Sequence, residues 1–249
     1  MKIGYYKHWS KNLKREIEYK TYGESGRGVL VFPSQDQRFY EWEDNGMIDT
    51  LKPMIEAGDF HLICCDSIDA ETWSLSSGDY NERIQLHEQW FKYIVEELIP
   101  KVNRGEKLIV TGCSMGGYHA ANFFFRRPDL FDGILSLSGL FHADYFFPKY
   151  KNALIFQNSP IDYLGNTSNY NLIVRELKNK TMIFCCGRGY YEEITGESTA
   201  RLGKILTRLG VEVWVDFWGT DVSHDFYWWR SQAKYFFEKI AVKNVSRAA

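Results

Sequence analysis

The sequence lacks any long run of apolar residues. No run approaches the ~18 residues that a membrane-spanning helix requires. The first residues, Met1 to His8, contain no apolar segment of the length found in signal peptides. We therefore expect a soluble, cytoplasmic protein without a membrane partner.

The sequence also lacks an excess of charge of one sign. The formal net charge is -2, and acidic and basic residues are interspersed. The longest basic cluster, Lys11 to Arg15, is short and is followed directly by Glu16. Nucleic-acid-binding proteins usually gather Lys and Arg on one face. The charge pattern therefore indicates a solvated surface and no nucleic-acid partner.

Cysteine is sparse and odd in number, with five residues in the chain. An odd count without a secretion signal argues against a disulfide framework. The pairs Cys64-Cys65 and Cys185-Cys186 end apolar runs typical of strands. Neighbouring strand residues point to opposite faces, so neither pair can present two thiolates to one metal. We expect these cysteines to be buried as small hydrophobic residues, with no metal or other cofactor bound.

Aromatic residues, in contrast, are abundant at 16% of the 249 residues. The length suits one α/β domain, which we expect to span residues 1–249. Short apolar runs alternate with segments of helical spacing, which favours βαβ units and a mostly parallel twisted sheet with helices on both faces. Strands are expected over 28–32, 60–65, 107–111, 133–137, 181–186 and 211–217, and helices over 47–57, 81–102, 115–125, 198–209 and 229–242.

The pattern weakens between about residues 140 and 180, where aromatic residues are frequent. We expect this stretch to leave the sheet and pass over its active edge. It would form a short cap or a pocket wall there.

The motif Gly112-Cys113-Ser114-Met115-Gly116 stands between an expected strand and an expected helix. A G-x-S-x-G motif in this context is typical of the nucleophile turn of the α/β-hydrolase fold. The turn is so sharp that the flanking residues must be small, and it exposes the serine hydroxyl at the end of the strand. We therefore predict Ser114 as a nucleophile.

The general base is expected after the last strand, because α/β-hydrolases place their triad in the order Ser, acid, His. Of the six histidines, only His224 lies in that loop, whose residues are polar and turn-forming. His87 and His119 fall within helices, and His142 comes too early in the chain. The order therefore predicts His224 as the base.

The acid is expected after the strand at 181–186. Glu192 and Glu193 both follow it, and either carboxylate would fix the tautomer of His224 and stabilise its cation. We favour Glu192, with Glu193 as the alternative. Asp221 and Asp225 are neighbours of His224 in sequence, but a loop neighbour rarely reaches the far ring nitrogen.

The oxyanion of an acyl-transfer intermediate needs two hydrogen-bond donors. The backbone N–H of Met115 is the first candidate, because it begins the helix after the nucleophile. The second is expected in the loop after the strand at 28–32, where we favour the backbone N–H of Gln35, with Asp36 as the next choice.

Longer motifs extend these local patterns. The nucleophile segment continues through Gly117-Tyr118, and Arg127-Pro128-Asp129-Leu130-Phe131 and Ser136-Leu137-Ser138-Gly139 follow it. The aromatic residues that trail His224, from Phe226 to Trp229, complete the set. Together these segments resemble the α/β-hydrolase family that includes esterase D (S-formylglutathione hydrolase), feruloyl esterases, enterochelin esterases and mycolyltransferases of the antigen 85 type.

The resemblance covers most of the chain, from about Val29 to about Trp229, and implies hydrolysis of a small-molecule carboxylic ester without a cofactor. Two other functions stay open. An acyltransferase would use the same triad while excluding water, and a non-catalytic binding protein could use the same fold. The sequence specifies neither the acyl and alcohol groups nor the oligomeric state.

Overall fold

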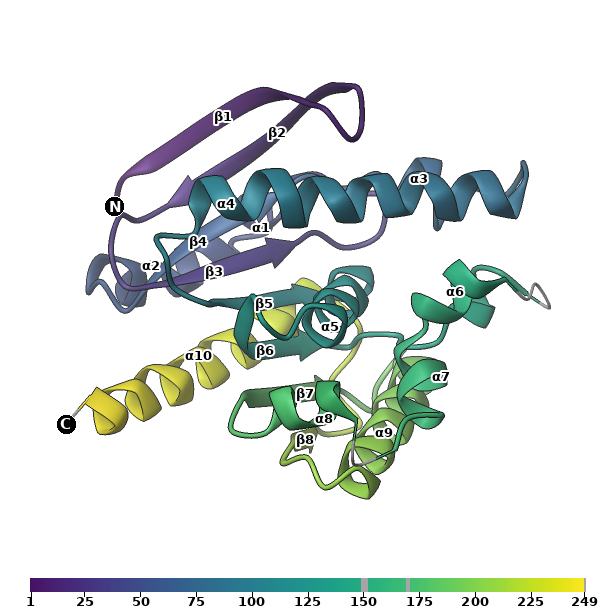
Figure 1. The fold of residues 1–249 in the computed structure, drawn as a ribbon. Coiled ribbons are helices and arrows are strands. Elements are labelled where there is room, and N and C mark those ends of the chain that lie inside the picture. The colour runs from purple at the N-terminus through teal and green to yellow at the C-terminus, as the bar shows by residue number, and fades with distance from the viewer. Residues whose placement is uncertain (149–151, 169–170, 249) are drawn as a thin grey trace.

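One eight-stranded sheet forms the centre of the computed structural model, which describes residues 1–148, 152–168 and 171–248 (Figure 1). The strand order is β1-β2-β4-β3-β5-β6-β7-β8, and all neighbours from β4 to β8 are parallel. This confirms the α/β class and the mostly parallel sheet. The strands are β1 (Ile3–Ser10), β2 (Arg15–Tyr22), β3 (Arg27–Phe32), β4 (Phe60–Cys65), β5 (Leu108–Cys113), β6 (Phe131–Leu137), β7 (Thr181–Cys186) and β8 (Trp214–Phe217).

Helices cover both faces of the sheet (Figure 1). They are α1 (Glu41–Asp44), α2 (Met47–Glu56), α3 (Tyr80–Lys92), α4 (Ile99–Val102), α5 (Met115–Arg126), α6 (Ala153–Gln157), α7 (Pro160–Gly165), α8 (Leu172–Leu177), α9 (Glu193–Arg208) and α10 (Phe226–Ala248). A π-helical segment, Tyr93–Leu98, joins α3 to α4, so the helix expected over 81–102 is interrupted in its hydrogen bonding but not in its course.

The alternation of side chains along β3 divides the core into two layers. Leu30 and Phe32 pack with residues of α3, α5 and α9, whereas Val29 and Val31 pack with residues of α2 and α10. Successive strand residues point to opposite faces, so a strand buried on both sides must be apolar throughout. This explains the uninterrupted apolar runs of the parallel strands.

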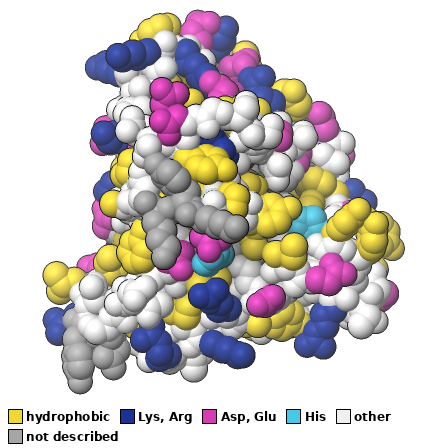
Figure 2. Space-filling model, turned by 90° about the vertical axis from the view of Figure 1, so that its right-hand side faces the viewer, with side chains coloured by type: hydrophobic (Ala, Val, Ile, Leu, Met, Phe, Trp, Pro, Cys, Tyr) yellow, Lys and Arg dark blue, Asp and Glu magenta, His cyan; other side chains and the backbone are white. Residues whose placement is uncertain are grey.

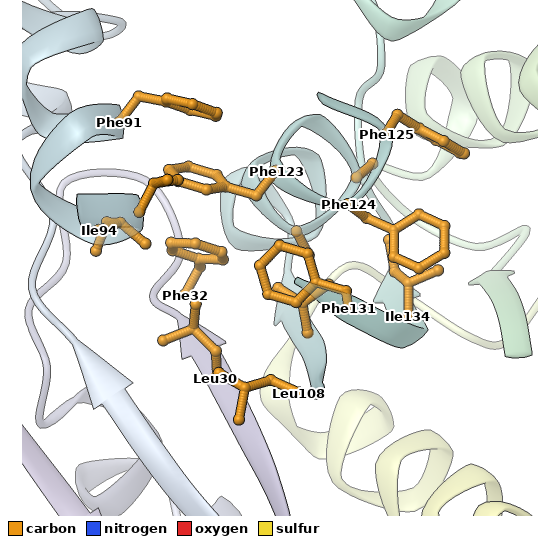
Figure 3. Close-up of a cluster of buried hydrophobic side chains, with 14 of the residues drawn as sticks. Leu30, Phe32, Phe91, Ile94, Leu108, Phe123, Phe124, Phe125, Phe131 and Ile134 are labelled. Atoms are coloured by element: carbon orange, nitrogen blue, oxygen red, sulfur yellow. The ribbon is translucent and has the colours of Figure 1, made fainter. Parts of the chain in front are cut away.

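Aromatic rings fill the first of these layers (Figure 3). Phe123, on α5, stacks on Phe91 at 4.5 Å between ring centroids and lies 4.7 Å from Phe32 of β3. Trp90 contacts both Phe32 and Phe123 edge-on. These contacts fix α5 against the sheet.

The N-terminal hairpin, β1 and β2, was not predicted from the sequence. Its turn contains no glycine, and Lys14 takes the positive φ of 52° that the turn needs. Strand β1 lies at one edge of the sheet, and both of its faces are largely exposed. Its residues Tyr5, Tyr6 and Trp9 are all exposed. Its apolar residues therefore follow no two-residue alternation. The short helix α1 was also not predicted. Several element ends differ from the prediction as well: β8 begins at Trp214, α9 at Glu193 and α10 at Phe226.

The stretch from 140 to 180 carries α6, α7 and α8. Asn158, fully buried, ties it to the rest of the protein. Its Oδ1 accepts hydrogen bonds from Asn122 and Arg126, both at 2.7 Å, and its Nδ2 donates to Glu88 at 2.6 Å. Its backbone oxygen accepts from the Tyr118 hydroxyl at 2.7 Å. The stretch is therefore anchored to α3 and α5.

All five cysteines are buried and form no disulfide, which agrees with their prediction as small hydrophobic residues. None of the helices in the described ranges is both long and apolar enough to span a bilayer. Among these same residues, no three His, Cys, Asp or Glu side chains are grouped to hold a metal ion.

We predict that Phe123→Ala lowers the free energy of unfolding by about 3–5 kcal/mol, because it leaves a cavity beside the rings of Phe32, Trp90 and Phe91. Denaturant unfolding monitored by circular dichroism measures this. Leu172→Ala is the control, since Leu172 is 72% exposed and its change should stay within about 0.5 kcal/mol. Equal effects of the two substitutions would contradict the packing described here.

Candidate active site

A sharp turn at Ser114 joins β5 to α5. Its backbone angles, φ 54° and ψ −121°, lie in a region that non-glycine residues rarely adopt. A Cβ atom on Gly112 would lie 2.4 Å from the backbone carbon of Gly116. A Cβ atom on Gly116 would lie 2.3 Å from the Phe32 carbonyl oxygen. The two glycines allow this contact between helix and sheet, and Ser114 is left half-buried at the carboxyl edge of β5.

The structure brings Ser114, His224 and Glu192 together from three separate loops. The Ser114 Oγ lies 2.8 Å from His224 Nε2, and His224 Nδ1 lies 3.1 Å from Glu192 Oε2. An ionised carboxylate only accepts hydrogen bonds, so Nδ1 carries the proton. His224 Nε2 is then free to accept the hydroxyl proton of Ser114. Such an arrangement is chemically able to activate a serine hydroxyl for nucleophilic attack.

Glu192 is 2% exposed, and its carboxylate is enclosed by donors. Its Oε1 accepts from the Ser138 hydroxyl at 2.5 Å and from the backbone N–H of Gly187 at 3.4 Å. Its Oε2 accepts from the Thr195 hydroxyl and from the Cys186 thiol. Burial raises the pKa of Glu192, but the hydrogen bonds from His224, Ser138 and Thr195 outweigh it, and the net pKa is lowered. The carboxylate is therefore held in its charged form.

The other three acids weighed from the sequence do not meet the His224 ring. Glu193 and Asp221 are exposed. The Asp225 carboxylate accepts instead from the Ser223 hydroxyl and from the backbone N–H of Trp228. Glu192 is thus the carboxylate that the described structure places on Nδ1 of His224.

The loop that holds Gln35 lies against the first turn of α5. Gly116 packs on the carbonyl oxygens of Phe32 and Pro33, so the loop and the Met115 backbone are neighbours. The buried carboxylate of Glu41 fixes this loop, because it accepts from the Ser34 backbone N–H at 2.8 Å and from the Ser34 hydroxyl. Burial raises the pKa of Glu41, and the bonds from Ser34 oppose that shift. The roles of Met115 and Gln35 as oxyanion donors remain predictions.

Sequence reasoning missed the residues that surround the carboxylate. Ser138, Thr195 and Trp229 are all buried beside Glu192 or its partner. Trp229 also packs edge-on against the His224 ring, at 4.8 Å between centroids. A signal was available for Ser138, since it directly follows β6, and β6 lies between the strands that carry Ser114 and lead to Glu192.

The remaining histidines of the helices have other partners. His119 Nε2 lies 2.8 Å from the Asp69 carboxylate in the core. His87 Nδ1 accepts from the Trp73 indole at 2.9 Å, which leaves its Nε2 proton for Asn158. Burial lowers the pKa of His87 far below its usual range, so the ring is neutral. Both rings are fully buried and hydrogen-bond to groups other than Ser114.

Figure 2 shows the side of the molecule on which α6 and α7 lie in Figure 1. Hydrophobic side chains gather near its centre among scattered charges. Tyr145, in the stretch after β6, is 61% exposed. Beside the loop that follows β3 lies a cavity of about 320 Å³ whose lining includes Asp36, Arg38 and Asp66.

Comparisons with known proteins support this fold. No protein-family model and no curated protein sequence matches the chain. Solved structures do match over nearly the whole length. A ferulic acid esterase is 15% identical with a TM-score of 0.73, and the match covers 96% of this chain and 97% of that one.

Two bacterial enzymes match this chain about equally well. A fluorophosphonate-binding serine hydrolase of Staphylococcus aureus is 14% identical with a TM-score of 0.71, covering 96% of this chain and 98% of that one. An S-formylglutathione hydrolase of Agrobacterium tumefaciens is 14% identical with a TM-score of 0.70, covering 96% and 94%. The chain has the α/β-hydrolase fold. The resemblance inferred from its motifs is thus confirmed at the level of the fold.

The lowered pKa of Glu192 predicts a pH effect on stability. A carboxyl group whose folded pKa is depressed contributes stability that is fully present above its unfolded pKa of about 4.3 and is lost as the pH falls through the folded pKa. Denaturant unfolding of the wild type should therefore lose more stability between pH 6 and pH 3 than that of Glu192→Gln. Parallel curves for the two proteins would contradict the charged, stabilised carboxylate.

Proposed function

We propose that the protein is a serine carboxylic-ester hydrolase in which Ser114 is the nucleophile, His224 the general base and Glu192 the orienting acid. One observation carries the proposal. A strained serine at the carboxyl edge of a parallel sheet contacts a histidine at 2.8 Å, and that histidine contacts a buried, ionised carboxylate at 3.1 Å. This geometry matches each role that nucleophilic acyl transfer requires.

In the acylation step, the Ser114 hydroxyl attacks the ester carbonyl carbon while His224 Nε2 takes its proton. The imidazolium that forms is stabilised by the Glu192 carboxylate across the Nδ1 hydrogen bond. His224 then gives the proton to the leaving alcohol, and an ester of Ser114 with the acyl group remains. Water, deprotonated by the same histidine, releases the acid and restores Ser114.

The negative charge on the carbonyl oxygen is greatest in the tetrahedral intermediate. We assign its stabilisation to the backbone N–H groups of Met115 and Gln35. Met115 is the first residue of α5, so the positive end of the helix dipole also acts at this point. A donor of this kind contributes about 3–4 kcal/mol to the transition state.

The structural neighbours support the reaction class. They include a ferulic acid esterase, a fluorophosphonate-binding serine hydrolase and an S-formylglutathione hydrolase. At 14–15% identity they share the fold with this chain, and the activity is inferred from the site. The mechanism uses only side chains and water, so it needs neither metal nor organic cofactor.

Hydrolysis of p-nitrophenyl acetate and butyrate tests the proposal. We expect turnover by the wild type and a loss of at least about 10³-fold for Ser114→Ala, because no other group can form the acyl-enzyme. Circular dichroism and thermal unfolding should show that the variant is folded. Equal rates for both proteins would overturn Ser114 as the nucleophile.

The oxyanion assignment predicts opposite results for two changes at one position. Gln35→Pro removes the backbone donor and should lower kcat about 10²–10³-fold. Gln35→Ala keeps that donor and should change kcat less than about threefold, since the side chain is exposed. If the alanine variant lost as much activity as the proline variant, the side chain and not the N–H would be the active group.

A further inference from the structure

Two buried side chains outside the triad, Trp229 and Ser138, continue its hydrogen bonds behind the acid. The Trp229 indole Nε1 lies 3.1 Å from the Ser138 Oγ, and the Ser138 Oγ lies 2.5 Å from Glu192 Oε1. Trp229 is 5% exposed and Ser138 is fully buried. Water therefore does not compete for these bonds.

The chemistry of the two groups gives the bonds a single direction. An indole N–H can only donate, so the Ser138 oxygen must accept from Trp229. A hydroxyl has one proton, and the remaining direction for it is toward Glu192 Oε1. The carboxylate can only accept, so it must take the Nδ1 proton of His224 on its other oxygen. The Ser138 hydroxyl thereby stabilises Glu192 as a carboxylate, the form that accepts the Nδ1 proton of His224.

The series ends at the nucleophile. With its proton on Nδ1, His224 presents a lone pair at Nε2 to the Ser114 hydroxyl, 2.8 Å away. The opposite tautomer would place a proton between Nε2 and Oγ and could not act as a base. The indole of Trp229 and the tautomer of His224 are therefore linked through two intermediate groups.

The backbone of Ser138 is strained, and other interactions in the fold must offset the free-energy cost of that strain. Its φ is 53°, a left-handed conformation that costs a non-glycine residue free energy. Glycine would adopt this φ without strain, yet it would lack the hydroxyl. A serine kept in a conformation suited to glycine is consistent with a need for its hydroxyl at this point.

We propose that Ser138 and Trp229 are positioning residues that orient the Glu192 carboxylate and fix the productive tautomer of His224. This inference rests on the proposed esterase function. Neither residue contacts the reacting atoms through these bonds. Thr195 assists from the opposite side, where its hydroxyl donates to Oε2.

Kinetics with p-nitrophenyl acetate at saturating and subsaturating concentrations test the proposal. Ser138→Ala should lower kcat about tenfold, the effect of losing a hydrogen bond to a charged group, and leave KM within about twofold. Ser138→Gly should lower kcat equally, because it lacks the same hydroxyl. It relieves the strained φ, however, and should be at least as stable as Ser138→Ala. If the two variants have equal kcat but differ in stability, the loss of kcat comes from the missing hydroxyl and not from a general loss of structure.

Trp229→Phe keeps a ring beside His224 and removes only the indole donor. It should lower kcat about threefold in the wild type and have no further effect in Ser138→Ala, because Trp229 acts through Ser138. Trp90→Phe is the matched control. It also removes a buried indole donor, here to the Asp66 carbonyl oxygen at 3.1 Å, and should lower stability without lowering kcat.

Proton NMR gives a second measurement that stability alone would not change. The Nδ1 proton of His224, bonded to a carboxylate, should give a resonance at low field in the wild type. That resonance should shift or broaden in Ser138→Ala and Trp229→Phe but not in Trp90→Phe. Unchanged kcat and unchanged resonance in both variants would overturn the positioning role.

Assaying Ser114→Ala in parallel distinguishes a failure of this inference from a failure of the proposed esterase function. An inactive Ser114→Ala together with fully active Ser138 and Trp229 variants would overturn the positioning role alone. Hydrolysis that is unaffected by Ser114→Ala would overturn the proposed function.

Discussion

The buried carboxylate of Glu192 is the constraint around which the C-terminal half of the protein is arranged. An uncompensated charge in the interior costs several kcal/mol, so the fold must supply donors to it from every side. They come from the end of β6 (Ser138), the end of β7 (Gly187 and Cys186), the first turn of α9 (Thr195) and the loop before α10 (His224). The same contacts that satisfy the charge also align these elements at one edge of the sheet.

A second constraint acts at the turn after β5, where the backbone at the start of α5 contacts the backbone of β5 and of the end of β3. Gly112 and Gly116 permit contacts that any side chain would block, and the cost appears as the strained angles of Ser114. Because β5 lies between β3 and β6, the serine is flanked by the loop after β3 on one side and by Ser138 on the other. The rigid aromatic layer beneath α5 holds this arrangement in place (Figure 3).

Much of this could be predicted from the sequence, because local signals and fold rules pointed to the same places. Six parallel strands are short apolar runs with clear ends, and the nucleophile motif stands at the junction of a strand and a helix. His224 followed from the chain order alone. Glu192 was favoured over Glu193 without a local signal, and it took the three-dimensional structure to show which carboxylate turns inward.

What could not be predicted depends on contacts between distant segments. The N-terminal hairpin escaped notice because its turn uses Lys14 at positive φ and its edge strand exposes aromatic residues on both faces. Ser138 and Thr195 bond to the Glu192 carboxylate and Trp229 bonds to Ser138, and these contacts join segments that are far apart in the sequence. Asn158 is similar, since its many partners lie on α3 and α5.

The central claim, that Ser114 is an activated nucleophile, is tested most directly by covalent modification. Diethyl p-nitrophenyl phosphate releases p-nitrophenolate as it phosphorylates an activated serine. We predict that one equivalent of p-nitrophenolate is released per protein molecule, and that mass spectrometry finds the added diethyl phosphoryl mass on Ser114. The reaction should be greatly slowed in His224→Ala. No modification, or modification at another residue with Ser114 untouched, would contradict it.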